Sequence, residues 1–356
     1  MRKQSLDFLK DLVRTHAPSG AEAPLQRVWM DYVSKYADKV ESDAYGNVVA
    51  TLNPGASPRI MLAAHADEIA MAVNHIDADG FVYVRRVGGV DPAVLRAQRV
   101  SIHTKKGLVQ GVVGNTAIHM KDASERSKVP PIHELFVDIG AKDRKTAQKL
   151  VRIGNPVTAN NEFEMLRDDI AISRVFDNRI GSWSIAETLR QLHPHRKKLH
   201  AEICAVSNIM EEVGCLGVQQ IAYSLHPDAA IVIDVTHATD SPGIGKAQHG
   251  DVKLGEGPTL THGGGNHPVL VERLEKIAKQ KKINLQHEAA SRTTGTDTDE
   301  VFLTRGGIPS ALISLPNRYM HSPSEMIHLG DLKNIPDLLT SFCRNLKAGE
   351  QFKVKI

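Results

Sequence analysis

The sequence predicts an α/β protein built on a mixed, largely parallel sheet that is flanked by helices, with a small β-barrel-like domain inserted in it. Two observations lead to this prediction. Helical and strand patterns alternate from about residue 179 onward, and the strands expected there are continuous apolar runs, which are typical of parallel strands covered on both faces. Between about 70 and 165 the chain instead shows short β-rich runs with frequent glycine, which indicate a barrel-like or sandwich-like unit.

The N-terminal part predicts two helices followed by two strands. Ser5 can cap a first helix, which the APSG segment at 17–20 ends, and a second helix carries apolar side chains at helical spacing between Leu25 and Tyr36. Residues 48–52 and 59–64 are expected strands, because each is an apolar run and a turn rich in glycine and proline joins them.

The later elements alternate in type. Helices are expected near 179–192, 216–225, 267–281, 297–304 and 331–346, and strands at 202–208, 229–233 and 310–315. Together with the N-terminal elements they predict one α/β domain made from both ends of the chain, residues 1–69 and 165–356. Residues 70–164 then form the inserted β-rich domain.

Composition and charge argue against several classes of function. The 356 residues include 44 basic and 41 acidic side chains without long charged blocks, so we expect no nucleic-acid partner. No run approaches the roughly 20 apolar residues of a membrane span, and the N-terminal residues lack a signal-peptide core. Cys204, Cys215 and Cys343 lie in apolar stretches and indicate buried thiols in a reducing compartment. We therefore expect a cytoplasmic protein without a membrane partner.

Potential metal ligands recur where expected strands end. Glu211 and Glu212 follow the strand at 202–208, and two neighbouring carboxylates repel each other unless a cation offsets their charge. Ligands of open α/β sheets bind at the carboxyl ends of strands, so groups that are far apart in sequence can converge there. Two histidines and several carboxylates without cysteine suit Zn²⁺, Co²⁺ or Mn²⁺. The remaining candidates are His65, Asp67, Asp177, Asp234 and His321.

Each of these residues has an ordinary structural explanation when it is taken alone. An aspartate before a helix, such as Asp177, is usually a cap, and a lone histidine after a strand is more often structural than a ligand. No functional role is predicted for His75, His119, His237 and His262.

Six motifs, in this order, together resemble one peptidase family. They are AAHADEIAMAV (63–73), VFDNRIG (175–181), MEEVGCLG (210–217), VIDVTH (232–237), GTDTDE (295–300) and NRYMHSPSE (317–325). The chain closely resembles the M42 family of cocatalytic metallo-aminopeptidases over essentially its whole length. The resemblance implies a zinc-exopeptidase-like fold, two divalent metal ions per subunit, short peptide substrates and a homo-oligomer such as a dodecamer. The inserted domain is then expected to serve oligomerisation.

The resemblance also implies a ligand set. His65 and Asp234 would hold one metal ion. Glu212 and His321 would hold the other, and Asp177 would bridge both.

Two further roles come from the same resemblance. Glu211 would be the general base, and Asp67 would orient the imidazole of His65. The family also implies a cis peptide between Asp177 and Asn178. The glycine usual after the HxDEI run is Ala70 here, which leaves every ligand in place.

The expected reaction is hydrolysis of the N-terminal residue of a short peptide. A two-metal dipeptidase, carboxypeptidase or deacylase is the main alternative, and an endoglucanase is less expected because aromatic residues make up only 4% of the chain. Side chains of neighbouring residues in a strand also diverge, so Glu211 and Glu212 would flank one glycosidic bond poorly. Arg318 and residues 295–299 could line the substrate site or be structural.

Overall fold

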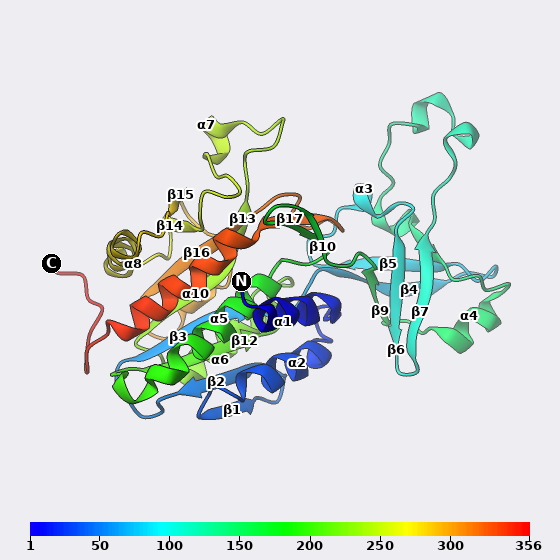
Figure 1. The fold of residues 1–356 in the computed structure, drawn as a ribbon. Helices are drawn as coiled ribbons and strands as arrows, with labels where there is room; N and C mark the ends of the chain where they lie inside the picture. Colours follow the sequence, from blue (N-terminus) through cyan, green and yellow to red (C-terminus); the bar gives the residue numbers. More distant parts are fainter.

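The computed structural model describes residues 1–356 and contains an eight-stranded mixed sheet (Figure 1). Across the sheet the strands are β1 (Lys39–Ser42), β2 (Val48–Leu52), β12 (Glu202–Asn208), β3 (Arg59–His65), β13 (Ala229–His237), β16 (Ser310–Asn317), β14 (Thr259–Gly263) and β15 (Gln286–Ala290). The four inner strands β12, β3, β13 and β16 run parallel, whereas β2 and β14 run antiparallel to their inner neighbours. The predicted fold class is confirmed.

Helices cover both faces of this sheet. They are α1 (Lys3–Arg14), α2 (Ala23–Val33), α5 (Arg179–Leu192), α8 (Pro268–Lys281) and α10 (Leu329–Arg344) on one face, and α6 (Leu216–Leu225) and α9 (Thr298–Leu303) on the other. None of the helices combines the length and the apolar character that crossing a bilayer requires.

Strand β3 shows why its sequence is apolar without alternation. Ile60 and Leu62 pack in the large core beneath α1, α5 and α10, whereas Met61 and Ala63 pack in a smaller core beneath α6 and α9. Successive side chains of a strand point to opposite faces, and here both faces are dry. The strand therefore lies inside the sheet, with packed side chains on both of its faces.

Most expected elements agree with the structure. The helices expected at 179–192 and 216–225 coincide with α5 and α6, and the strand expected at 202–208 coincides with β12. Strand β13 extends beyond the expected 229–233, because its pairing with β16 continues as far as His237. Asp234 therefore lies inside this strand instead of closing it.

The predicted cap of the first helix is wrong. Helix α1 begins at Lys3, and Ser5 lies inside it, buried. The hydroxyl of Ser5 donates to Glu187 Oε2 on α5 at 2.9 Å. A tertiary partner therefore uses the hydroxyl group that the sequence pattern assigned to the helix terminus.

The part of the chain between β3 and α5 forms a closed six-stranded barrel. In barrel order its strands are β4 (Ala70–Ile76), β5 (Val82–Val87), β8 (Phe136–Asp138), β7 (Gly107–Val113), β6 (Arg99–Thr104) and β9 (Pro156–Ala159). The short helices α3 (Pro92–Leu95) and α4 (Arg144–Leu150) accompany it, and it has a hydrophobic core of its own. Figure 1 shows the barrel beside the layered sheet, with a long excursion that projects from it.

Smaller elements complete the fold. The barrel excursion carries three 3-10 turns, Ile118–Met120, Ala123–Glu125 and Ile132–Glu134, and another, His193–Lys198, follows α5. A three-stranded sheet pairs β10 (Glu164–Arg167), β11 (Ile170–Ser173) and β17 (Glu325–His328), and the short helix α7 (Lys246–His249) lies in the loop after β13.

A polar contact joins the barrel to the helical layer. His16, between α1 and α2, lies with its Nδ1 2.7 Å from Thr158 Oγ1 on β9, and His103 Nε2 on β6 lies 2.8 Å from the same oxygen. Burial and the charge of Arg174 lower the pKa of His16 to about 2, from an ordinary value of 6.5. The imidazole is therefore neutral in the folded protein over the whole ordinary pH range.

This contact predicts that the folded protein becomes less stable at acidic pH. Between pH 2 and 6.5 the unfolded state binds a proton at His16 that the folded state does not bind, so the free energy of unfolding falls as the pH drops below about 6.5. Replacing His16 by asparagine should lower the number of protons taken up on unfolding by as much as one. The free energy of unfolding should then depend less steeply on pH. Urea unfolding of the wild type and of His16→Asn across this range measures the difference, and His200→Asn, at an exposed histidine, is the control. Equal pH slopes for wild type and His16→Asn would contradict the expectation.

Candidate metal centre

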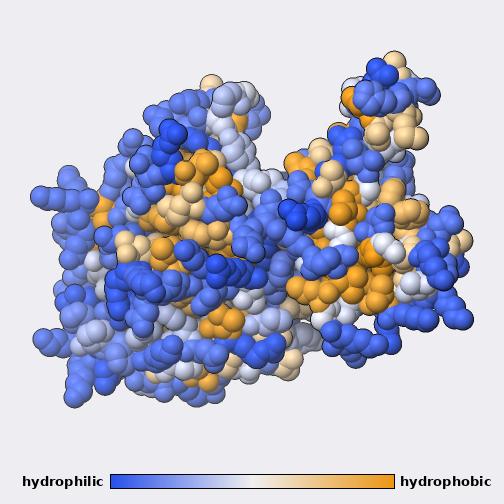
Figure 2. Space-filling view, turned by 45° about the vertical axis from the view of Figure 1, so that its right-hand side comes forward, coloured by the Kyte–Doolittle hydropathy of each residue, from blue (hydrophilic) through white to orange (hydrophobic).

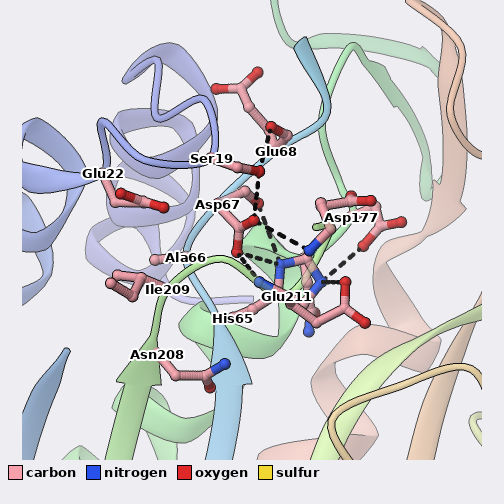
Figure 3. Close-up of polar contacts among 12 residues, drawn as sticks. Ser19, Glu22, His65, Ala66, Asp67, Glu68, Asp177, Asn208, Ile209 and Glu211 are labelled. Atoms are coloured by element: carbon pink, nitrogen blue, oxygen red, sulfur yellow. Dashed lines mark hydrogen bonds and ion pairs between the residues drawn. The ribbon is translucent and has the colours of Figure 1, made fainter. Parts of the chain in front are cut away.

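The predicted ligands come from five segments that meet at one edge of the central sheet. His65 is the last residue of β3, and its register partner on β12 is Asn208. The turn that carries Glu211 and Glu212 follows β12 and therefore starts beside His65 (Figure 3). Asp177 precedes α5, with a cis peptide to Asn178 as the resemblance implied, Asp234 lies on β13, and His321 lies in the loop between β16 and β17.

One group of side chains surrounds the imidazole of His65. Its Nε2 lies 3.2 Å from Asp177 Oδ1, 3.7 Å from Glu211 Oε2 and 3.9 Å from Asp234 Oδ1. His65 and Asp234 are almost completely buried. Ligand atoms this close together can share one small cation.

A second group surrounds the imidazole of His321. Its Nε2 lies 3.3 Å from Asp177 Oδ2 and 3.4 Å from Glu212 Oε2. Burial opposes the charged imidazole, but these two carboxylates raise the pKa of His321 to about 11. The two oxygens of Asp177 therefore face two different histidines, one in each group.

The two groups contain more acidic side chains than imidazoles. Burial raises the pKa values of Glu211, Glu212 and Asp234, and repulsion from neighbouring carboxylates raises them further, in the case of Glu211 to about 10. Burial also works against a charged His65, but Glu211 and Asp177 raise its pKa well above the usual range. The buried acids outnumber the imidazoles, so a bound cation would neutralise charge that the protein itself does not.

Asp67 connects the imidazole to the acidic turn. Its Oδ1 lies 3.3 Å from His65 Nδ1 and accepts the amide N–H of Glu211 at 2.9 Å. Its Oδ2 accepts the hydroxyl of Ser19 at 2.6 Å (Figure 3). The same oxygen accepts the amide N–H of Glu212 at 3.2 Å. One buried carboxylate thus fixes both the ring of His65 and the backbone of the two glutamates.

Sequence reasoning missed Glu325. This buried carboxylate accepts the amide N–H groups of Phe176 and Asp177 on Oε2, at 2.6 and 3.0 Å, and that of His321 on Oε1 at 3.0 Å. It therefore holds together the backbone of two predicted ligands that lie far apart in sequence. The only sequence signal is its place four residues after His321 in the last motif.

The sequence did not decide whether Asp297, within residues 295–299, lines the substrate site or is structural. Asp297 is completely buried, accepts Asn208 Nδ2 at 2.7 Å on one oxygen, and has no hydrogen-bond partner on the other. Together with Glu211 and Cys215 it forms a third close group of possible ligand atoms. Arg318, by contrast, forms an ion pair with Asp240 at 2.6 Å and belongs to none of these groups.

The expectation of three buried thiols is only partly correct. Cys204 and Cys343 are buried, but Cys215 is partly exposed because it lies in the turn that precedes α6. Its Sγ donates to Glu211 Oε1 at 3.5 Å. Cys215 therefore contacts the acidic turn and is not only a packing residue.

Comparison with known proteins identifies the family. Residues 46–338 match the sequence model described as M42 glutamyl aminopeptidase. The chain belongs to the M42 family of aminopeptidases. It is therefore a hydrolase that acts on peptide bonds, and the resemblance drawn from the six motifs is confirmed.

Individual M42-like relatives agree with this membership. A lysyl aminopeptidase of Pyrococcus furiosus is 33% identical over 344 residues, which cover 96% of this chain and 97% of the relative. The TET aminopeptidase of Thaumarchaeota archaeon SCGC AB-539-E09 superposes with a TM-score of 0.91 at 30% identity over 96% of both chains. The TET1 peptidase of Pyrococcus horikoshii, which can assemble into a tetrahedron or a large octahedral shell, gives a TM-score of 0.86 at 29% identity, over 96% of this chain and 100% of that one.

Proposed function

We propose that this chain is a dinuclear-metal aminopeptidase that removes N-terminal residues from short peptides. The strongest support comes from Asp177, whose two oxygens face two different imidazoles at 3.2 and 3.3 Å. In this proposal His65 and Asp234 hold one ion. Glu212 and His321 hold the other, and Asp177 bridges the pair.

The donor atoms suit such ions. Each position combines one imidazole with carboxylates, His65 with Asp177 and Asp234 and His321 with Asp177 and Glu212. No thiol lies in either group, which favours Zn²⁺, Co²⁺ or Mn²⁺ over softer metals. The buried and mutually repelling acids also need positive charge, as their raised pKa values indicate. Asp67 lies beside Nδ1 of His65, and Glu325 accepts the amide N–H of His321. Both carboxylates orient proposed ligands without binding the ion, as carboxylates beside metal-binding histidines commonly do.

Two bound cations would acidify a shared water and polarise the scissile carbonyl. Within this arrangement Glu211 is the general base, which takes the proton of the attacking water and delivers it to the leaving amine. Its carboxylate lies beside His65 and Asp234, and its amide N–H is fixed by Asp67. Asp67 therefore acts through other residues, by holding both the base and a ligand in place.

A requirement for a free N-terminal amine tests this function. The substrate's ammonium group would lie among the surplus carboxylates, so acetylating it should abolish cleavage. A panel of aminoacyl-p-nitroanilides and their N-acetylated counterparts, assayed with Zn²⁺, Co²⁺ and Mn²⁺ after chelation, measures this directly. Release of p-nitroaniline from the acetylated substrates would contradict an aminopeptidase. Release of the C-terminal residue from N-acetylated peptides would favour the carboxypeptidase alternative, release of acetate would favour a deacylase, and cleavage of dipeptides but not of longer peptides would favour a dipeptidase.

The barrel suits an oligomerisation role. We propose that residues 70–164 form an inserted domain in the catalytic domain of residues 1–69 and 165–356, and that cytoplasmic homo-oligomers such as dodecamers form through it. Figure 2 shows apolar side chains at the surface over the barrel. Leu108 on β7 is 52% exposed, and Ile118 and Met120 on the excursion are 58 and 80% exposed. The Pyrococcus horikoshii relative can assemble into a tetrahedron or a large octahedral shell. Such a shell would admit only short peptides.

The role proposed for Glu325 gives a separate test. Glu325→Gln would place an amide NH₂ against backbone N–H donors, so the ligands Asp177 and His321 would lose their support. We expect metal affinity to fall about 10- to 100-fold, measured by competition with a chromogenic chelator. The matched control is Glu187→Gln, which alters another buried glutamate that bonds to Ser5 and Arg190 far from the ligands. Unchanged affinity in Glu325→Gln would refute the role.

A further inference from the structure

A second cluster of metal-binding side chains lies away from the proposed catalytic centre. It consists of His262 on β14, Glu275 on α8 and His287 on β15. These three elements follow one another in the chain and form one β–α–β unit at the edge of the central sheet, on the side away from the barrel (Figure 1). β15 is the last strand of the sheet and pairs only with β14.

The register of the two strands explains why these side chains meet. Leu260 on β14 is buried in the core that includes α8, and its parallel partner on β15 is His287. His262 is two residues beyond Leu260, so it shares that face of the sheet. Glu275 follows the buried Leu274 on α8 and reaches toward both imidazoles.

The separations between the three ligand atoms fit one metal ion. His262 Nε2 lies 2.9 Å from His287 Nδ1, and Glu275 Oε1 lies 3.6 and 3.7 Å from these two nitrogens. The point in their plane that is equidistant from the three atoms lies about 2.0 Å from each, which matches zinc–nitrogen and zinc–oxygen bond lengths. No ligand atom would have to move far to coordinate an ion there.

The cluster is independent of the catalytic residues. β14 runs antiparallel to β16 with Thr259 opposite Ser314, the residue that is also the partner of Asp234 on the other side of β16. His262 lies three residues farther along β14 and therefore approaches the opposite edge of the sheet. None of the three residues contacts a predicted catalytic ligand.

Water and metal ions can reach the three side chains, and the two ring nitrogens contact only each other and Glu275. They lie at hydrogen-bond distance from each other, so an ion would displace the proton between them. Glu275 has no basic partner except the two imidazoles, and all three side chains are between 38 and 50% exposed. His262 and His287 border a surface hollow of about 680 Å³, so water can complete the coordination shell. Two imidazoles and one carboxylate with an open position form a donor set known from zinc sites, and the same donors also bind Co²⁺, Ni²⁺ or Cu²⁺.

We propose that His262, Glu275 and His287 bind one divalent transition-metal ion, zinc in the first place, which ties the edge strand β15 to β14 and α8. An edge strand has hydrogen bonds on one side only, and a bridging ion would restrain it at the side chains as well. The ion takes no part in peptide hydrolysis.

The zinc stoichiometry of the full-length protein tests this inference. After chelation, the wild type and His287→Ala are dialysed against the same zinc buffer, and zinc per chain is measured by mass spectrometry. We expect His287→Ala to bind one zinc ion fewer per chain than the wild type, whatever number the catalytic centre holds, and to keep its peptidase activity. His249→Ala is the matched control, because His249 borders the same hollow but lies outside the cluster.

A local measurement shows whether the ion lies where we infer. Hydrogen exchange of the amides of β15 (Gln286–Ala290) should be slower with zinc in the wild type and in His249→Ala, and unaffected by zinc in His287→Ala. Equal zinc content in the wild type and His287→Ala would overturn the inference. So would zinc-independent exchange of β15 in the wild type.

Discussion

Replacing Glu211 by glutamine is expected to lower kcat about 100- to 10,000-fold while the metal content stays that of the wild type. Glutamine has nearly the same shape as glutamate but cannot take a proton from water at neutral pH. The amide N–H of residue 211 would still donate to Asp67, so the acidic turn should keep its position. Steady-state kinetics and metal analysis of the same preparation measure both parts of this expectation.

Both parts are needed because Glu211 lies close to a proposed ligand group. Its Oε2 is 3.7 Å from His65 Nε2, a separation that would also allow Glu211 to act as a ligand beside Asp234. A ligand role predicts loss of metal from Glu211→Gln together with loss of turnover. The neighbouring variant Glu212→Gln is the matched control, since it should lose metal at the His321 position. Wild-type turnover in Glu211→Gln would contradict any catalytic role.

The sequence predicted the parts of the fold that carry a clear pattern. The expected bounds of β12 and α5 agree with the structure, because an apolar run of 7 residues has the length of a strand and a helical period over 14 residues has the length of a helix. The edge strands β14 and β15 were missed. β15 reads QHEAA, with half-buried and exposed positions in alternation, and so short a polar segment gives no signal that distinguishes it from a loop.

The candidate site was only partly predictable for a different reason. The candidate ligands could be selected because strand ends in α/β sheets converge, and the resemblance to the family supplied the role expected of each. Glu325 could not be selected, because its partners are backbone N–H groups near position 176 and at 321. Any acid can accept such bonds, so only the folded chain shows which acid does. The cluster around His262 was missed similarly, since two of its members lie on the unpredicted strands.

Replacing Asp177 by asparagine is expected to reduce the occupancy of both metal positions and to remove nearly all activity. The two oxygens of Asp177 lie 3.2 and 3.3 Å from the imidazoles of His65 and His321. Hydrogen bonds from these imidazoles overcome the effect of burial and lower the pKa of Asp177, so its carboxylate is charged. Asparagine offers one neutral oxygen in place of two charged ones, and an NH₂ group cannot bind a cation.

The comparison with Asp234→Asn makes this expectation specific. Of the two imidazoles, Asp234 lies near that of His65, so its loss should weaken one position and leave the ion beside His321 in place. Metal per chain, measured after dialysis against buffered zinc, should therefore fall by about two ions in Asp177→Asn and by about one in Asp234→Asn, if each position holds one ion. Circular dichroism shows whether both variants fold. If a folded Asp177→Asn lost a single ion, Asp177 would belong to one position, and the bridging arrangement on which the two-metal function depends would be wrong.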